Sequence, residues 1–85
     1  MPRAISMRHT IVPLPERDEF RDTARRAQKH YAAAGCHYWL FEESSLPGAY
    51  VEFFEASAPD TLQQAHRGAP SPIADSARMY VEVEL

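Results

Sequence analysis

The 85-residue chain has one cysteine, three glycines, no asparagine and no long apolar run. A single cysteine cannot form an intramolecular disulfide, and no His, Cys, Asp or Glu residues have the spacing of a metal site. No segment approaches the ~20 apolar residues of a membrane span. The first apolar residues alternate with polar ones, which is unlike a signal peptide. We therefore expect a soluble cytoplasmic protein with no metal and no cofactor.

Positive charge is also scarce. The net charge is -3, from nine Lys and Arg against twelve Asp and Glu, so the chain offers little attraction to nucleic acid or another polyanion. The length predicts one domain over residues 1–85. A chain this short buries only about 60 to 65% of its unfolded surface, which makes a lone subunit marginally stable and a second subunit a plausible aid.

Alternation of apolar and polar residues predicts a strand over 4–12, which Pro13 and Pro15 end because proline cannot donate to a sheet. A helix is expected from Glu16 to the αL-type terminator Gly35. Its apolar stripe consists of Phe20, Ala24, Ala27, Tyr31 and Ala34.

Two strands near 37–43 and 48–55 are predicted to form a hairpin, and this hairpin holds most of the aromatic residues. Residues 57–60 have the pattern of a helix cap, which predicts a second helix to about Arg67. A loop over 69–76 and an alternating strand near 79–85 complete the order βαββαβ. This order predicts an α+β, ferredoxin-like domain with a four-stranded antiparallel sheet and both helices on one face.

The alternation also assigns the two sheet faces. We expect the helices to cover Ile5, Met7, Ile11, Val51, Phe53, Met79, Val81 and Val83. We expect the uncovered face to carry Ser6, Arg8, Thr10, Tyr50, Glu52, Phe54, Tyr80, Glu82 and Glu84. For the first hairpin strand, pairing of Glu43 with Ala49 would place Trp39 under the helices, and a slip of one residue would reverse this.

An RNA-recognition domain shares this topology. The segment 49–53 matches the back half of its aromatic strand motif, but Leu46, Pro47 and Gly48 replace the basic, glycine and aromatic residues of the front half. Three glutamates on the expected RNA face would repel phosphate. We therefore expect no nucleic-acid partner.

Three segments, AAGC at 33–36, YVEFFEAS at 50–57 and LQQAH at 62–66, occur in an order that resembles the antibiotic-biosynthesis-monooxygenase-like proteins. In that family the corresponding motifs are "AG-C", "E-x-W" and "L-x-x-H". The resemblance implies a homodimeric α+β barrel in which two sheets close around a ligand cavity, and cofactor-independent oxidation of phenolic substrates. The chain departs from the family where a tryptophan would follow the strand, and the lack of asparagine excludes the haem-degrading triad of the superfamily.

His66 and Glu52 are the candidate catalytic residues, because a cavity histidine or a desolvated carboxylate can transfer protons. The alternatives are a half-buried structural histidine and an ion pair between Glu52 and Arg8. The expected cavity residues are Arg8, Tyr50, Phe54, Tyr80 and Trp39; the aromatic ones among them could hold a flat aromatic ligand or simply fill a dimer interface.

Two functions follow from these candidates. The first is a monooxygenase-like enzyme acting, without a cofactor, on an aromatic or polyketide-like small molecule. The second is a non-catalytic homodimer that binds a small molecule or stabilises an assembly. The sequence leaves this choice open.

Overall fold

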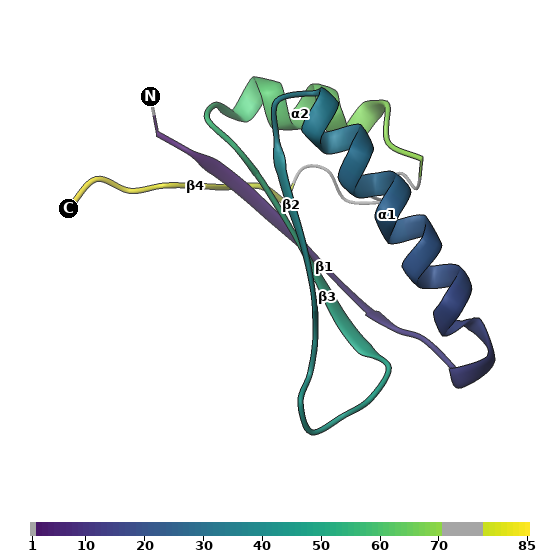
Figure 1. Ribbon diagram of the computed structural model, residues 1–85. Coiled ribbons are helices and arrows are strands. Elements are labelled where there is room, and N and C mark those ends of the chain that lie inside the picture. Colours follow the sequence, from purple (N-terminus) through teal and green to yellow (C-terminus); the bar gives the residue numbers. More distant parts are fainter. Residues whose placement is uncertain (1, 71–77) are drawn as a thin grey trace.

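The computed structural model describes residues 2–70 and 78–85 (Figure 1). Its elements follow the chain as β1 (Ala4–Ile11), a 3₁₀ turn η1 (Leu14–Glu16), α1 (Arg17–Ala33), β2 (His37–Glu42), β3 (Ala49–Ala56), α2 (Pro59–Arg67) and β4 (Tyr80–Val81).

The four strands form one sheet in the order β2-β3-β1-β4, and every neighbouring pair is antiparallel. Both helices lie on the same side of this sheet (Figure 1). The predicted α+β, ferredoxin-like fold is therefore confirmed.

The ends of the elements follow local chemistry. Gly35 ends α1 with a positive φ of 80°, as the sequence predicts, and Gly48 in the hairpin turn has a φ of 90°. The predicted cap at 57–60 is wrong in detail, because Ala58 is the N-cap of α2 and makes no side-chain hydrogen bond. The last strand is shorter than predicted, and most of the expected loop over 69–76 lies outside the described residues.

The predicted hairpin register is confirmed. The Glu43 amide donates to the Ala49 carbonyl, Phe41 pairs with Val51 and Trp39 pairs with Phe53. In an antiparallel sheet, directly paired residues point to the same face, so Trp39 and Phe53 share a face of the sheet.

The predicted assignment of the faces is wrong for β1, β2 and β3. The helices cover the face that carries Ser6, Arg8, Tyr38, Glu52 and Phe54. Phe54 is almost fully buried and packs in one core cluster with residues of both helices. For β4 the prediction holds, because Tyr80 pairs with Ile5 on the uncovered face and Val81 pairs with Ala4 on the helix side.

The uncovered face is the apolar one. Trp39 is 43% exposed and Phe41 54% exposed, and Ile5, Met7, Ile11 and Tyr80 are also open to solvent. Val51 and Phe53 are half-buried between them. We call these eight residues the bare face. Neither helix of the subunit covers these residues.

Candidate functional site

A buried ion pair lies between the sheet and the helices. Glu52, on β3, is 3% exposed and faces Arg8 on the adjacent strand β1. The Arg8 Nε atom donates to Glu52 Oε1 over 2.7 Å and Nη2 donates to Oε2 over 3.1 Å. The Tyr38 hydroxyl, from β2, donates to Glu52 Oε2 over 2.6 Å. The ion pair considered from the sequence is thus present, and a third strand contributes to it.

A second buried group surrounds His66, which is 2% exposed on α2. Its Nε2 atom lies 2.7 Å from the Ser6 hydroxyl of β1, and its Nδ1 atom lies 2.7 Å from the Tyr31 hydroxyl of α1. A neutral imidazole has one donor and one acceptor nitrogen, and hydroxyls can serve both. In this arrangement His66 holds three elements together and has no ring nitrogen open to a ligand.

The electrostatics agree with this assignment. Burial, together with the positive charges of Arg8 and His30, lowers the pKa of His66, which favours the neutral ring. Burial raises the pKa of Tyr31 and Tyr38 well above the usual tyrosine range. Both phenols therefore keep their protons at neutral pH.

Burial opposes the charge of Arg8, but the hydrogen bond and the charge of Glu52 outweigh it and raise the Arg8 pKa. The Arg8 guanidinium therefore stays charged across the physiological range. Replacing one partner would leave a buried charge uncompensated, which is far costlier than the net gain from the intact pair.

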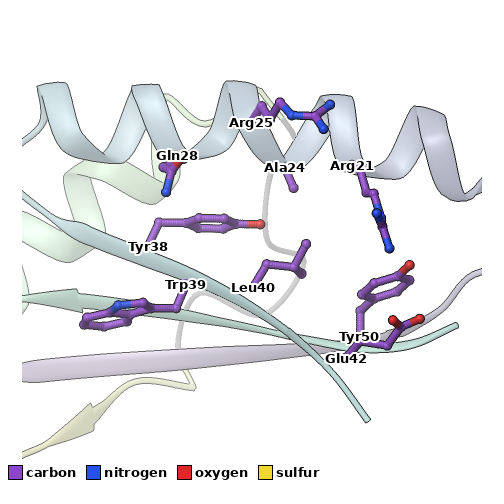
Figure 2. Close-up of a pocket in the computed structure, with 9 residues that line it drawn as sticks. All are labelled: Arg21, Ala24, Arg25, Gln28, Tyr38, Trp39, Leu40, Glu42 and Tyr50. Carbon is purple, nitrogen blue, oxygen red and sulfur yellow. The ribbon is translucent and has the colours of Figure 1, made fainter. Parts of the chain in front are cut away.

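A pocket of about 500 Å³ opens beside this network, between α1 and the β2–β3 hairpin (Figure 2). We call it the α1–β2 pocket. It is lined by Arg21, Ala24, Arg25, Gln28, Tyr38, Trp39, Leu40, Glu42 and Tyr50. Tyr38 belongs both to the pocket and to the buried network, so it links the open space to Glu52.

Tyr50 stands at one end of the pocket and is 4% exposed. Its hydroxyl is buried and makes no hydrogen bond of good geometry with any described residue. The Arg21 guanidinium and the Glu42 carboxylate lie beside it (Figure 2). Interaction with Tyr50, and then with Glu42 and Asp18, raises the pKa of Arg21, so the three groups at this end are electrostatically coupled.

The structure divides the residues that the sequence singled out. Glu52, Arg8, Tyr50, Phe54 and His66 all lie on the helix side of the sheet. The two remaining cavity candidates, Trp39 and Tyr80, lie on the bare face. Trp39 pairs with Phe53 and Tyr80 pairs with Ile5, and both partners belong to that face. The seven residues therefore do not line one common cavity. Glu52 and His66 are separately partnered, and neither lines the α1–β2 pocket.

Sequence reasoning missed Ser6, Tyr31 and Tyr38 as polar partners, and Arg21 as a pocket residue. One signal was available. Tyr31 on the stripe of α1 and His66 on the stripe of α2 bring polar tips into the core, and such tips require polar partners on the strands beneath them.

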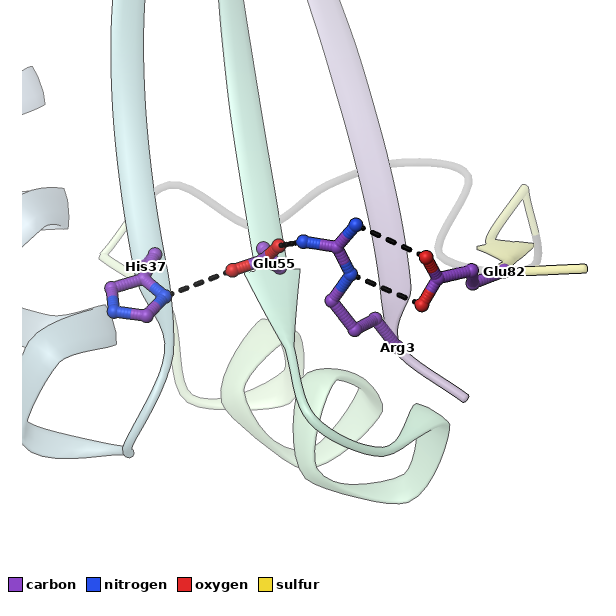
Figure 3. A network of polar contacts seen from close by, with 4 residues as sticks. All are labelled: Arg3, His37, Glu55 and Glu82. Atoms are coloured by element: carbon purple, nitrogen blue, oxygen red, sulfur yellow. Dashed lines mark hydrogen bonds and ion pairs between the residues drawn. The ribbon is translucent and has the colours of Figure 1, made fainter. Parts of the chain in front are cut away.

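The bare face has its own polar network at one end (Figure 3). Glu55 accepts a hydrogen bond from Arg3 Nη1 over 2.9 Å, and its other oxygen lies 2.9 Å from His37 Nδ1. Arg3 also donates two hydrogen bonds to Glu82. Among the described residues, no three His, Cys, Asp or Glu side chains are grouped to hold a metal ion, and no helix is long and apolar enough to cross a membrane.

No protein-family model and no curated protein matches the chain. A solved structure, Rv0793 from Mycobacterium tuberculosis, superposes with a TM-score of 0.64 at 18% sequence identity. The match covers 100% of this chain and 96% of that one. At this identity the likeness establishes a shared α+β fold over the full length and nothing about activity.

Proposed function

We propose that the protein is a homodimer of α+β barrel type that binds a small aromatic molecule in each subunit. The observation that carries this proposal is the bare face, whose apolar residues no helix of the same chain covers. Soluble monomers rarely expose a contiguous apolar patch of this kind.

The dimensions of the sheet favour a second copy as the occupant. β1 and β3 have eight residues each. At ~3.3 Å per residue and ~4.8 Å between strands, the face measures roughly 26 by 14 Å in projection. Its projecting side chains raise the accessible area toward the ~800 Å² that each partner buries in an ordinary stable interface. Two such sheets can pack face to face about 10 Å apart.

The charges at the edge of the bare face also favour a second copy of the chain as its partner. The carboxylate of Glu55, on the bare face, is already paired with Arg3 and His37 within the subunit (Figure 3). The centre of the face is apolar and its end is polar, with both carboxylates there paired to Arg3 of the same subunit, which is the usual anatomy of a protein interface. A twofold arrangement would therefore not bring unpaired like charges from Glu55 together.

Dimerisation through the bare face leaves the α1–β2 pocket available, because that pocket opens on the helix side of the sheet. Its volume of about 500 Å³ lies within the range of small-molecule sites. Aromatic side chains and a few polar groups line it, as is usual for such sites.

The substitution Phe41→Lys tests the proposal. Phe41 is on the bare face and makes an edge-to-face contact with Phe53. Burying two lysines per dimer should raise the dimer dissociation constant by about 100-fold or more. Sedimentation velocity would measure this, with Leu14→Lys as control, because Leu14 is an exposed apolar residue of η1 away from the sheet. Equal effects of both substitutions, or none from Phe41→Lys, would contradict the proposed interface.

A monooxygenase-like enzyme is the second candidate, and the contact between Tyr38 and Glu52 favours it. This contact joins a pocket residue to a buried carboxylate that could accept a substrate proton through the tyrosine. Anthrone, with an activated methylene group, suits the test. The methylene would lose two hydrogens and gain one oxygen atom from O₂, and the other oxygen atom would leave as water.

Oxygen uptake with anthrone should then exceed the background rate and fall at least about 100-fold in Tyr38→Phe, which breaks the relay while keeping the ring. His37→Gln, on the other sheet face, should leave the rate unchanged. Uptake that matches the background in the unmodified protein would exclude this reaction and leave the binding function standing.

A further inference from the structure

The Tyr50 hydroxyl is the least satisfied polar group of the described core. It is the one buried side-chain oxygen or nitrogen in residues 2–70 and 78–85 that lacks a hydrogen-bond partner. Native proteins leave few such groups, and leaving one unpaired costs ~1–3 kcal/mol. A ligand acceptor at this end of the α1–β2 pocket would give it the well-aligned hydrogen bond that Arg21 and Glu42, which lie beside it, do not.

Arg21 lies between this hydroxyl and the solvent. It is exposed on α1, and its guanidinium reaches down from the helix toward Tyr50 (Figure 2). A long exposed side chain can move at little cost, so a ligand that draws Arg21 outward would also uncover the hydroxyl. The two groups together present a planar cationic fork and a neutral donor, and this combination suits a carboxylate.

Glu42 lies beside Arg21 and Tyr50 and reduces this preference, but the charges of the pocket as a whole do not cancel it. Glu42 is the single acidic residue that lines it, and its Oε2 atom accepts the Gly48 amide over 2.9 Å. Arg25 also lines the pocket and pairs with Asp22 outside it. The lining therefore carries two cations and one anion.

The middle of the pocket is flat and apolar. The rings of Tyr38 and Tyr50 and the side chain of Leu40 form one wall, and Ala24 leaves room on the helix side (Figure 2). Aromatic walls of this kind accept a planar ring system by offset stacking or edge contacts. Gln28 adds an amide near Tyr38, away from Arg21.

We propose that the α1–β2 pocket binds a planar aromatic carboxylate, whose acid group pairs with Arg21 and accepts the Tyr50 hydroxyl. The rings of this ligand lie against Tyr38 and Leu40. The inference rests on the proposed small-molecule-binding function and names its ligand class.

Three probes separate the contributions of the aromatic rings and of the carboxylate charge to binding. 2-Naphthoate carries both the rings and the charge, 2-naphthamide keeps the rings without the charge, and cyclohexanecarboxylate keeps the charge without the flat ring. Calorimetric titration of the full chain gives the affinity for each probe. We expect naphthoate to bind at least about 10-fold more tightly than either analogue.

Two substitutions test the residues. Arg21→Gln and Tyr50→Phe should each weaken naphthoate binding by about 10-fold or more and leave naphthamide binding unchanged. Arg26→Gln is the matched control, because Arg26 is an exposed arginine of α1 that does not line the pocket. Circular dichroism would verify that all three variants are folded.

The possible failures are distinguishable. Equal affinities for naphthoate and naphthamide, or an Arg21→Gln effect no larger than that of Arg26→Gln, would overturn the carboxylate assignment while the pocket remained a binding site. No binding of any probe to a protein that sediments as a dimer would overturn this inference and the binding half of the proposed function, but not the dimer. A monomer that binds naphthoate would overturn the proposed dimer but support the binding function and this inference.

Discussion

Polar residues occupy the centre of the helix-covered sheet face because each finds a partner there. Glu52 pairs with Arg8 and Tyr38, and Ser6 pairs with His66. From the sequence, Ser6, Arg8 and Glu52 are expected on the sheet face that the helices leave uncovered. The prediction failed because polarity signals exposure only when the partner is water, and the partners here come from distant positions in the chain.

His66 makes stability depend on pH. Its pKa is lowered in the fold, by burial first, then by Arg8 and His30, while the unfolded chain has the ordinary value of about 6.5. The unfolded state therefore binds the proton more readily. The His66 contribution is fully present above about pH 6.5 and is lost as pH falls toward the lowered folded pKa, with a slope of at most ~1.4 kcal/mol per pH unit.

Urea unfolding between pH 5 and 8 at fixed protein concentration would measure this effect. In His66→Gln the loss of stability below pH 6.5 should be smaller than in the unmodified protein. His9→Gln serves as the control, because His9 is exposed on β1. If His66→Gln retained the full acid dependence, the proton would bind elsewhere.

At the scale of elements, the sequence predicts the order and pairing of the strands and helices, but it does not predict which sheet face the helices cover. The order of strands and helices, the Gly35 terminator and the hairpin register are all recovered. The face assignment is not, because both sides of β3 are rich in large apolar residues. Tyr50 and Phe54 point to the helices, and Val51 and Phe53 point away. Alternation with a period of two distinguishes the sides but cannot say which side meets the helices when both are apolar.

Gly35 tests the connection between α1 and β2. Its φ is 80°, and an added Cβ would meet no atom within 4 Å, so a substitution there costs backbone strain alone. Gly35→Ala should lower the free energy of unfolding by about 1 kcal/mol, and Gly35→Asn by less, since asparagine tolerates the left-handed region. Denaturant unfolding at one protein concentration measures both. An alanine variant as stable as the parent, or an asparagine variant less stable than the alanine one, would contradict this.

At the scale of the whole molecule, the two faces of the sheet differ in structure. The helix side buries a partnered polar network and opens the α1–β2 pocket, while the bare face exposes Trp39, Phe41 and their apolar neighbours. The candidate residues of the sequence divide between these faces because the prediction reversed the two faces of β1, β2 and β3 but not that of β4. A short chain gains stability by burying such a face against a second copy, and the isologous contact of a twofold dimer needs no additional partner.

The mass of the unmodified protein in solution is the most direct test of this account. Sedimentation equilibrium at micromolar concentration should give twice the 9.6 kDa mass of one chain, with a monomer appearing only on further dilution. A single species of 9.6 kDa over the same range would show that the bare face is not covered by a second copy, and would contradict the central claim.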